Sequence, residues 1–523
     1  MKIIPKPNSI KLTGGYLVLD GYNFTNFFKN NDKFIREVFS EFLPFLENLP
    51  ANINFLEEKG LKEEEYRLVI DDKITVYAST SKGSFYGLQS IKQLLIEYKN
   101  KLPKLEILDS PRFSYRSFML DESRHFFGMD VVKETLDIMA MLKLNNFHWH
   151  LTDDQGWRVE IKKYPLLTSK GSIRQSSQKA ILGQFFKNCL HDNVEYGKGL
   201  FYTQEQLKEI VLYAKERYIE ICPEIDMPGH LTAAISCYPE LSCFNENIDV
   251  SKYFGIHKVI GCAGKQQLYD FVEDVIYELK DIFTSGYFHI GGDEAPKEKW
   301  KQCPNCQRAI KEHDLKDEQA LQGYFNNQIV SYLQGFNKRT IAWNEILKSG
   351  TVSDDTVVQY WTGNPDKNGV NNWLEKGNNI IISKCTRLYM DYPYPLEPIK
   401  YSYETDLESV GINPKYEGQV LGFEAPLWSE YVASKGKLEY QIYPRIMSLA
   451  EINWTDKSKK SYKDFEENLQ NLYTYFDSKN IKYATIKASN PVGINRLCRI
   501  VSSSQTMLLC PDYEYEKYCK TTK

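Results

Sequence analysis

The stretch from 287 to 294, Tyr-Phe-His-Ile-Gly-Gly-Asp-Glu, decides the architecture that we expect for this chain. It is a short apolar run with strand-preferring side chains, and it ends on two glycines followed by two carboxylates. Amphipathic helices are predicted on both sides of it, at residues 265–283 and 317–334, and a second apolar run follows at 340–343. Strands and helices therefore alternate around this stretch, as they do in an α/β fold.

The same alternation extends over a long central part of the chain. Besides 287–290 and 340–343, strands are predicted at 117–120, 146–151, 218–225, 356–360, 379–383 and 420–423, and helices at 131–142 and 203–217. Eight strands over about 345 residues, from 111 to 455, suit a (β/α)₈ TIM barrel with insertions, which carries the catalytic site. A doubly wound open sheet competes, but it normally has a glycine-rich phosphate loop, and the sequence contains no G-x-G-x-x-G or Walker motif.

Two smaller parts flank the predicted barrel. Residues 1–110 indicate a non-catalytic α/β domain, with strands at 66–70 and 74–78 and a helix at 86–98. Pro111 marks the boundary after it. Residues 456–523 indicate one helix, at 462–477, and a polar tail, both packing on the barrel.

Composition excludes several classes of protein. The chain has 523 residues, and 65 basic against 69 acidic side chains give a net charge of −4, so a basic face for nucleic acid is not expected. No apolar run approaches the roughly 18 residues of a membrane span. Pro5, Pro7 and Lys11 interrupt the start of the chain where a signal peptide needs an unbroken apolar segment, so we expect a cytoplasmic protein.

The eleven cysteines are mostly scattered, which fits reduced thiols. Cys303-Pro-Asn-Cys306 is the exception, because its spacing suits half of a zinc site. No second pair of cysteines or histidines at finger spacing follows it, and His313 stands alone. We therefore expect a local turn or a reversible disulfide here before structural zinc.

Polar and aromatic residues follow almost every predicted barrel strand. Catalytic groups of such barrels lie at the carboxyl ends of the strands, so these residues are the candidates for a site. Carboxylates and indoles without a phosphate loop or a nucleophile elbow are typical of sugar chemistry, which makes a glycosidase the first hypothesis. The residues in question are Asp121, Arg124, Asp153, Trp157, Asp226, His230, Asp293, Glu294, Glu345, Trp361, Tyr389, Asp391, Glu424, Trp428 and Glu430.

Histidines offer a rival hypothesis. His148 and His150 would lie on one side of a barrel strand, and His230 and His289 follow or end two others. Such histidines can bind a metal inside a barrel, so a metal-dependent amidohydrolase stays the alternative from the residues alone.

The pair Asp293-Glu294 is the sharpest local feature. Gly291 and Gly292 permit a sharp turn, so two adjacent acids can both face a cleft, which regular strand alternation would forbid. Two close carboxyls also separate each other's pKa values, leaving one protonated as an acid and the other ionised. A turn that caps the next helix explains the same residues equally well.

Four longer motifs resemble one known family. They are His289-Ile-Gly-Gly-Asp-Glu294, His148-Trp-His-Leu-Thr-Asp-Asp-Gln-Gly-Trp-Arg158, Pro223-Glu-Ile-Asp-Met-Pro-Gly-His230 and Arg124-His125-Phe126. Together they are similar to the β-N-acetylhexosaminidases of glycoside hydrolase family 20, over about residues 1 to 480. The resemblance implies exo-acting, retaining hydrolysis of terminal β-linked N-acetylglucosamine or N-acetylgalactosamine, with the substrate's own acetamido group as nucleophile and an oxazolinium intermediate.

The resemblance also implies the partners. We expect an oligosaccharide or glycoconjugate substrate, no metal and no organic cofactor, no nucleic acid or membrane partner, and a monomer or homodimer.

Roles for individual residues follow from the same resemblance. Glu294 is the general acid and then the base, Asp293 orients the acetamido N–H, and Tyr389 hydrogen-bonds the acetamido oxygen. Trp343, Trp361 and Trp428 form an aromatic wall around the sugar. Arg124, Asp391 and Glu430 bind the sugar, Arg124 and Glu430 through its hydroxyls. The supporting residues are Asp153, His150, Asp226 and His230.

Two departures and two alternatives complete the prediction. Glu122 stands where many relatives have a small or apolar residue, so it either alters the rim or faces away. The loop at 171–199 is long and polar, and we expect it to shape the binding site for the rest of the substrate. A lacto-N-biosidase would need a deeper pocket than Arg124 and Glu430 suggest. A non-catalytic glycan-binding barrel would have no use for the proton donor Glu294 beside the acetamido-binding residues Asp293 and Tyr389.

Overall fold

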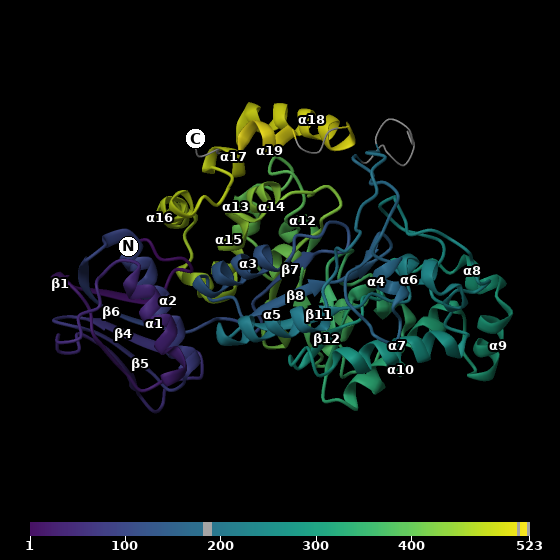
Figure 1. Cartoon of the computed structure of the whole chain (residues 1–523), viewed down its shortest axis with the longest axis horizontal. Helices are drawn as coiled ribbons and strands as arrows, with labels where there is room; N and C mark the ends of the chain where they lie inside the picture. Colours follow the sequence, from purple (N-terminus) through teal and green to yellow (C-terminus); the bar gives the residue numbers. More distant parts are fainter. Residues whose placement is uncertain (181–190, 510–512, 520–523) are drawn as a thin grey trace.

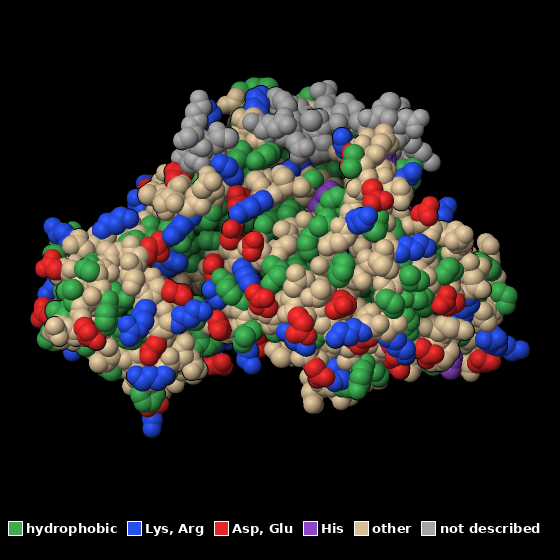
Figure 2. Space-filling model, viewed as in Figure 1, with side chains coloured by type: hydrophobic (Ala, Val, Ile, Leu, Met, Phe, Trp, Pro, Cys, Tyr) green, Lys and Arg blue, Asp and Glu red, His purple; other side chains and the backbone are tan. Residues whose placement is uncertain are grey.

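The computed structural model describes residues 1–180, 191–509 and 513–519 (Figure 1). Part of the predicted 171–199 loop and Cys510 in the tail lie outside these residues. A closed barrel forms the centre of the molecule, and a separate sheet lies at one end of it. Acidic and basic side chains are interspersed over the face drawn in Figure 2, in line with the small net charge.

Eight parallel strands close the barrel in the order β11-β12-β13-β14-β15-β16-β7-β8. All side chains of β7 and β8 are buried, because strands of a parallel barrel are covered on both faces. The predicted TIM barrel is confirmed. Its strands are β7 Ser117–Asp121, β8 Asn146–His150, β11 Glu220–Glu224, β12 Tyr287–His289, β13 Arg339–Trp343, β14 Val357–Tyr360, β15 Ile380–Ile382 and β16 Val420–Leu427.

The strand register brings the carboxyl ends of four neighbouring strands to one level. His150 at the end of β8 pairs with Asp121 of β7 on one side and with Glu224 of β11 on the other. Glu224 pairs in turn with His289, the last residue of β12. The residues that follow these strands therefore meet at one rim of the barrel.

Helices cover the outside of the barrel and begin where the sequence provides caps. Thr203 forms a capping box with Gln206, and the Asp317 carboxylate accepts from the first turn of its helix, which satisfies amide groups that otherwise lack a partner. The main outer helices are α3 Met129–Met141, α5 Gln204–Glu216, α7 Gln266–Leu279, α10 Glu318–Gln334, α14 Lys435–Ile442 and α15 Arg445–Trp454.

Short elements lie in the loops after the strands. They are β9 Thr152–Asp153, β10 Gly156–Trp157, α4 Leu166–Ser169, α6 Thr232–Cys237, η3 Pro239–Leu241, α8 Glu298–Gln302, α9 Pro304–Glu312, η4 Asn344–Ser349, α11 Val370–Glu375, α12 Cys385–Leu388 and α13 Ile399–Tyr403.

The amino-terminal part is a six-stranded mixed sheet in the order β1-β6-β4-β5-β3-β2. Helix α2 Ser81–Tyr98 packs on β4, β5 and β6 and also contacts α3 of the barrel, so it lies between the sheet and the barrel. Its side chains are buried over most of its length. The other elements are β1 Ser9–Val18, β2 Phe24–Asn26, α1 Asp32–Ser40, β3 Ile53–Glu57, β4 Tyr66–Ile70, β5 Ile74–Ala78 and β6 Lys101–Asp109.

Beyond the barrel the chain is more helical than the sequence predicted. Helix α16 Tyr462–Lys479 begins where it was predicted to begin, and it packs against α2. The predicted polar tail contains α17 Ile486–Ser489, α18 Gly493–Leu509 and α19 Tyr513–Tyr518. None of the helices in the described part of the chain combines the length and the apolar character that crossing a bilayer requires.

Candidate active site

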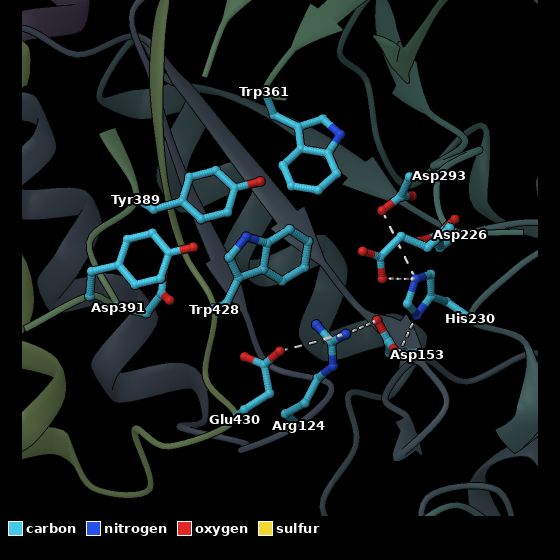
Figure 3. Close-up of a pocket in the computed structure, with 12 residues that line it drawn as sticks. Arg124, Asp153, Asp226, His230, Asp293, Trp361, Tyr389, Asp391, Trp428 and Glu430 are labelled. Atoms are coloured by element: carbon cyan, nitrogen blue, oxygen red, sulfur yellow. Dashed lines mark hydrogen bonds and ion pairs between the residues drawn. The ribbon is translucent and has the colours of Figure 1, made fainter. Parts of the chain in front are cut away.

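A pocket of about 180 Å³ opens at the carboxyl ends of the barrel strands (Figure 3). This volume is below the roughly 300 Å³ at which pockets for drug-sized ligands begin, so the pocket suits one small ring. It brings together 11 of the 13 predicted site residues, the exceptions being Trp343 and His150. The lining residues are Arg124, Asp153, Asp226, His230, Asp293, Glu294, Trp361, Tyr389, Asp391, Tyr392, Trp428 and Glu430.

A tight turn after β12 places both acids of the Asp293-Glu294 pair in the pocket. Gly291 and Gly292 have φ values of 67° and 94°, which favour glycine. A Cβ at Gly291 would also come within 1.7 Å of Asp226 Oδ1. Helix α8 begins only at Glu298, so the pair does not cap it. The two glycines therefore allow both acids to face the pocket, as one of the two sequence-based hypotheses expected. The other hypothesis, a turn that caps the next helix, is wrong.

The His230 imidazole connects the two acids to the loop that follows β8. Its Nδ1 lies 3.1 Å from Asp153 Oδ1, and its Nε2 lies 3.6 Å from Glu294 Oε2 and 3.9 Å from Asp293 Oδ2. Burial lowers the pKa of His230, but Asp153 and its other acidic neighbours outweigh this and raise the pKa well above its ordinary value. A positively charged imidazolium therefore faces both acids.

Asp293 is the more enclosed of the two acids, with 11% of its side chain exposed against 29% for Glu294. Burial raises the pKa of Asp293 to about 7, His230 opposes the rise, and Glu345 and Glu294 add to it. Its Oδ1 is buried and has no hydrogen-bond partner among the described residues. Asp293 therefore offers a ligand a free acceptor whose charge changes near neutral pH.

Arg124 is fixed at one side of the pocket by three acceptors. Its Nε donates to Gln155 Oε1 at 2.9 Å, Nη1 to Asp121 Oδ2 at 3.2 Å, and Nη2 lies 2.7 Å from Asp153 Oδ2. Glu430 Oε1 lies 4.0 Å from the same Nη2. A guanidinium has five donors, so two N–H groups remain for a ligand beside a carboxylate that can accept.

Aromatic rings form the opposite wall and the floor. Trp361 and Tyr389 are nearly parallel, with centroids 6.1 Å apart and an angle of 14° between the planes. Trp428 lies 6.2 Å from Tyr389, and the Arg124 guanidinium lies 5.1 Å from the Trp428 ring. Burial raises the pKa of Tyr389 well above its ordinary value, so its hydroxyl keeps its proton and can donate.

Trp343 lies one layer below this wall. Its ring centroid is 5.9 Å from that of Trp428, it is almost completely buried, and it does not line the pocket. Its Nε1 donates to Glu224 Oε1 at 2.8 Å. In this structure Trp343 thus supports the floor from beneath.

The comparisons with known proteins agree with this geometry. The model of the glycosyl hydrolase family 20 catalytic domain matches residues 113–457, and that of domain 2 of the family matches residues 1–110. The chain belongs to glycosyl hydrolase family 20. Its relatives include a beta-hexosaminidase of Porphyromonas gingivalis, 39% identical over 454 residues that cover 83% of this chain and 56% of that protein.

Further relatives cover more of their own length. A beta-hexosaminidase of Akkermansia muciniphila is 32% identical over 78% of this chain and 83% of that protein. The solved structure of the family 20 exo beta-N-acetylglucosaminidase of Vibrio harveyi, in complex with N-acetylglucosamine, superimposes with a TM-score of 0.81. It is 29% identical and covers 92% of this chain and 78% of that one.

Glu224 is a central residue that the sequence analysis of this family 20 chain did not select. The carboxylate is fully buried, and it contacts the rings of His148, His150, His289 and Trp343. His150 Nε2 in turn lies 2.8 Å from Asp153 Oδ2, so Glu224 acts on the pocket through His150. The signal was a glutamate directly after the apolar residues of a predicted barrel strand, at a position where an unpaired charge is rarely buried.

The histidine contacts bear on the metal-hydrolase alternative. Burial lowers the pKa of His148, but Glu424 and Glu224 together raise it to about 9. His150 and His230 are shifted upward as well, with carboxylates as the cause. The carboxylates beside these three rings therefore favour the charged imidazolium form, which donates hydrogen bonds to them.

Two further side chains complete the site. Asp391 lines the pocket, and burial, followed by Glu430, raises its pKa to about 8. Its Oδ1 is buried without a partner among the described residues. Tyr392, which the sequence analysis missed, lies beside it, and its ring centroid is 6.1 Å from that of Tyr389. Nothing in the sequence distinguishes Tyr392 from the other tyrosines near it as a pocket residue.

Glu122 faces away from the pocket. Its carboxylate accepts from Trp149 Nε1 at 2.6 Å and from the Tyr202 hydroxyl at 2.7 Å, and it also accepts from the backbone of Phe127 and Gly128. It therefore holds the start of α3 and does not shape the rim.

Proposed function

We propose that this chain is an exo-acting, retaining β-N-acetylhexosaminidase that uses the acetamido group of its substrate as the nucleophile. The observation that carries the proposal is the arrangement around Asp293. Its unpartnered Oδ1, the Tyr389 hydroxyl and the Trp361 ring line one pocket with the acid Glu294. An acetamido group has one N–H donor, one carbonyl acceptor and one methyl group. Asp293 Oδ1 can accept the N–H, the Tyr389 hydroxyl can donate to the carbonyl oxygen, and the Trp361 ring can pack against the methyl group.

The reaction starts with proton transfer from Glu294. The Glu294 carboxyl gives its proton to the glycosidic oxygen while the acetamido oxygen attacks C1, so the C1–O bond to the leaving group breaks and an oxazolinium ring forms. The Glu294 carboxylate then takes a proton from water, whose oxygen attacks C1 and opens the ring. The product has the original anomeric configuration, because C1 is inverted twice.

Asp293 and Tyr389 act on the acetamido group during this reaction. The Asp293 carboxylate accepts the acetamido N–H and stabilises the positive charge that develops on the ring. Binding of that N–H favours the ionised form of Asp293. The Tyr389 hydroxyl donates to the acetamido oxygen and directs it toward C1.

The far end of the pocket supports exo action on a single terminal sugar. Arg124, Glu430 and Asp391 close it with donors and acceptors for ring hydroxyls, and the volume of about 180 Å³ suits one ring. A lacto-N-biosidase would need space for a second sugar beyond these residues. We propose glycans that end in β-linked N-acetylglucosamine as substrates, with β-linked N-acetylgalactosamine as a second terminal sugar.

The test compares the release of 4-nitrophenol from its β-N-acetylglucosaminide, β-N-acetylgalactosaminide and β-glucoside. A parallel series contains N-acetylglucosamine thiazoline, which mimics the oxazolinium ring. We expect hydrolysis of the two acetamido sugars only, blocked by the thiazoline. Equal hydrolysis of the β-glucoside would refute substrate assistance, and tight thiazoline binding without any hydrolysis would indicate the glycan-binding alternative.

A further inference from the structure

Four cysteine side chains gather behind the catalytic loops, outside the pocket. They are Cys243, Cys262, Cys303 and Cys306, here called the four-cysteine cluster, and none of them is more than 6% exposed. All four Sγ atoms lie within 4.8 Å of one another. Cys262 Sγ is 3.5 Å from Cys306 Sγ and 3.7 Å from Cys303 Sγ, and Cys243 Sγ is 3.9 Å from Cys306 Sγ.

These separations match four ligands of one metal ion. Zinc bound by four thiolates has Zn–S distances of about 2.3 Å, and a regular tetrahedron of that radius places its sulfurs about 3.8 Å apart. A disulfide would instead bring two sulfurs to about 2.05 Å and leave them without a shared centre. A compact set of four soft ligands selects zinc or iron over magnesium or calcium.

Only the Cys303/Cys306 half of this cluster is recognisable in the sequence, because the other two cysteines come from a separate loop. Cys243 and Cys262 lie at the two ends of the segment between η3 and α7, which a bridge between Ser242 and Gly261 holds together. Cys303 is the N-cap of α9, and Cys306 lies in the first turn of that helix. A helix N-terminus favours negative charge, so it favours the thiolate form of these two ligands.

The two loops are in close contact around the cluster. A Cβ at Gly264 would lie 2.3 Å from the backbone nitrogen of Cys306, so only glycine allows this approach. Trp300 Nε1 donates to the Gly261 carbonyl at 2.9 Å. The Gly264 backbone N–H also donates to the Cys262 sulfur. Donors directed at a ligating sulfur are typical of metal sites.

We propose that Cys243, Cys262, Cys303 and Cys306 bind one structural Zn²⁺ ion. Binding replaces the thiol protons, which are released to solvent, and involves no change of oxidation state. The ion joins the loop that follows β11, which carries Asp226 and His230, to the loop that follows β12, which carries Asp293 and Glu294. All four ligand positions are filled by cysteine, so the ion has no open position for substrate and takes no part in the hydrolysis.

Metal analysis of the purified full-length chain tests this proposal directly. We expect about one zinc per chain after production in zinc-supplemented medium and extensive dialysis without chelator. An organomercurial that titrates the thiols should release that zinc in proportion, as followed with a chromogenic chelator. Less than about 0.1 zinc per chain, or disulfides between these cysteines in the native protein, would overturn the proposal, and one iron in place of zinc would overturn the choice of metal.

Two variants locate the ion in the sequence. Cys303→Ser with Cys306→Ser should lose the zinc, whereas the matched double variant Cys385→Ser with Cys498→Ser, whose cysteines lie outside the cluster, should keep it. If the first variant does not fold, replacement of zinc by Co²⁺ in the wild-type chain gives a second measurement. Cobalt held by four thiolates has intense sulfur-to-metal absorption and the visible bands of a tetrahedral site, and a weak octahedral spectrum would contradict the assignment.

Discussion

Two clusters of buried polar side chains in the described part of the chain, one at each end of the barrel, differ in how completely their polar atoms are hydrogen-bonded. At the amino ends of the strands, where α2 and the sheet pack on the barrel, Asp109 Oδ2 accepts from Tyr66, Lys143 and Trp454 at 2.8 to 3.2 Å. At the carboxyl ends, buried polar atoms of Asp293, Asp391 and Trp361 have no partner among the described residues.

The difference separates groups that stabilise the fold from groups that bind a ligand. A buried polar atom without a partner costs about 1–3 kcal/mol, so a region in which several occur together needs a compensating partner from outside. The pocket has this property, and the contact around Asp109 does not. Charges at the sheet contact should therefore determine stability, and charges in the pocket should determine activity.

The largest expected effect is that of Glu294→Gln in the pocket. Loss of the proton donor should lower turnover of substrates with poor leaving groups by about 10²- to 10⁴-fold, with thiazoline binding and the melting temperature largely kept. Steady-state kinetics and thermal unfolding measure the two properties on the same sample. Unchanged turnover would show that Glu294 is not the acid.

The next effect concerns stability and belongs to the sheet contact. Lys143→Met removes the ammonium group 3.2 Å from Asp109 Oδ2 and leaves a fully buried carboxylate without its charge partner. We expect the free energy of unfolding to fall by about 3–5 kcal/mol, measured in urea, with little change in turnover below the transition.

Asp109→Asn added to Lys143→Met provides the control. It removes the uncompensated negative charge and should restore part of the lost stability. A variant that loses turnover while its unfolding midpoint is unchanged would break the distinction between the two regions.

The smallest effect is a pH shift in the pocket. The pKa of Asp293 is raised to about 7 by burial, with Glu345 among the contributors, and Asp293 must be ionised to accept the acetamido N–H. Activity should therefore fall as pH drops through about 7. Glu345→Gln removes a negative neighbour, so it should lower the pKa of Asp293 and move the acidic limb of kcat/KM to lower pH, by less than about one unit.

Glu345→Asp keeps the charge and should leave the limb near its original position. A limb that moves to higher pH in Glu345→Gln, or equally in both variants, would show that Glu345 does not act through its charge on Asp293.

Much of this organisation could be predicted from the sequence because it is local. The barrel strands are short buried runs, and the site residues follow those runs directly, as Asp293 and Glu294 follow β12. Gly291 and Gly292 likewise disclosed the turn that directs both acids into the pocket. Patterns of this kind depend on neighbours in the chain, so one sequence is sufficient to see them.

The remainder depends on contacts between distant segments. Glu224 is important because its neighbours on two other strands are histidines, and no spacing along the chain reveals that. Cys243 and Cys262 stand singly in the sequence, although they lie beside Cys303 and Cys306 in the fold. The position of Trp343 beneath Trp428 likewise depends on a contact between distant segments, so the sequence does not reveal it. The division of the chain at 110 and at 455 stays a prediction.

The position of α2 between the sheet and the barrel has a consequence for protein engineering. A barrel produced without residues 1–110 would expose the buried side chains of Arg116, Lys143 and Trp454 and would leave both cations without Glu64 and Asp109. The catalytic barrel is therefore not an exchangeable module. A chimera or a shortened enzyme made from this chain has to carry the sheet and α2 with it, or replace that whole polar contact with apolar side chains.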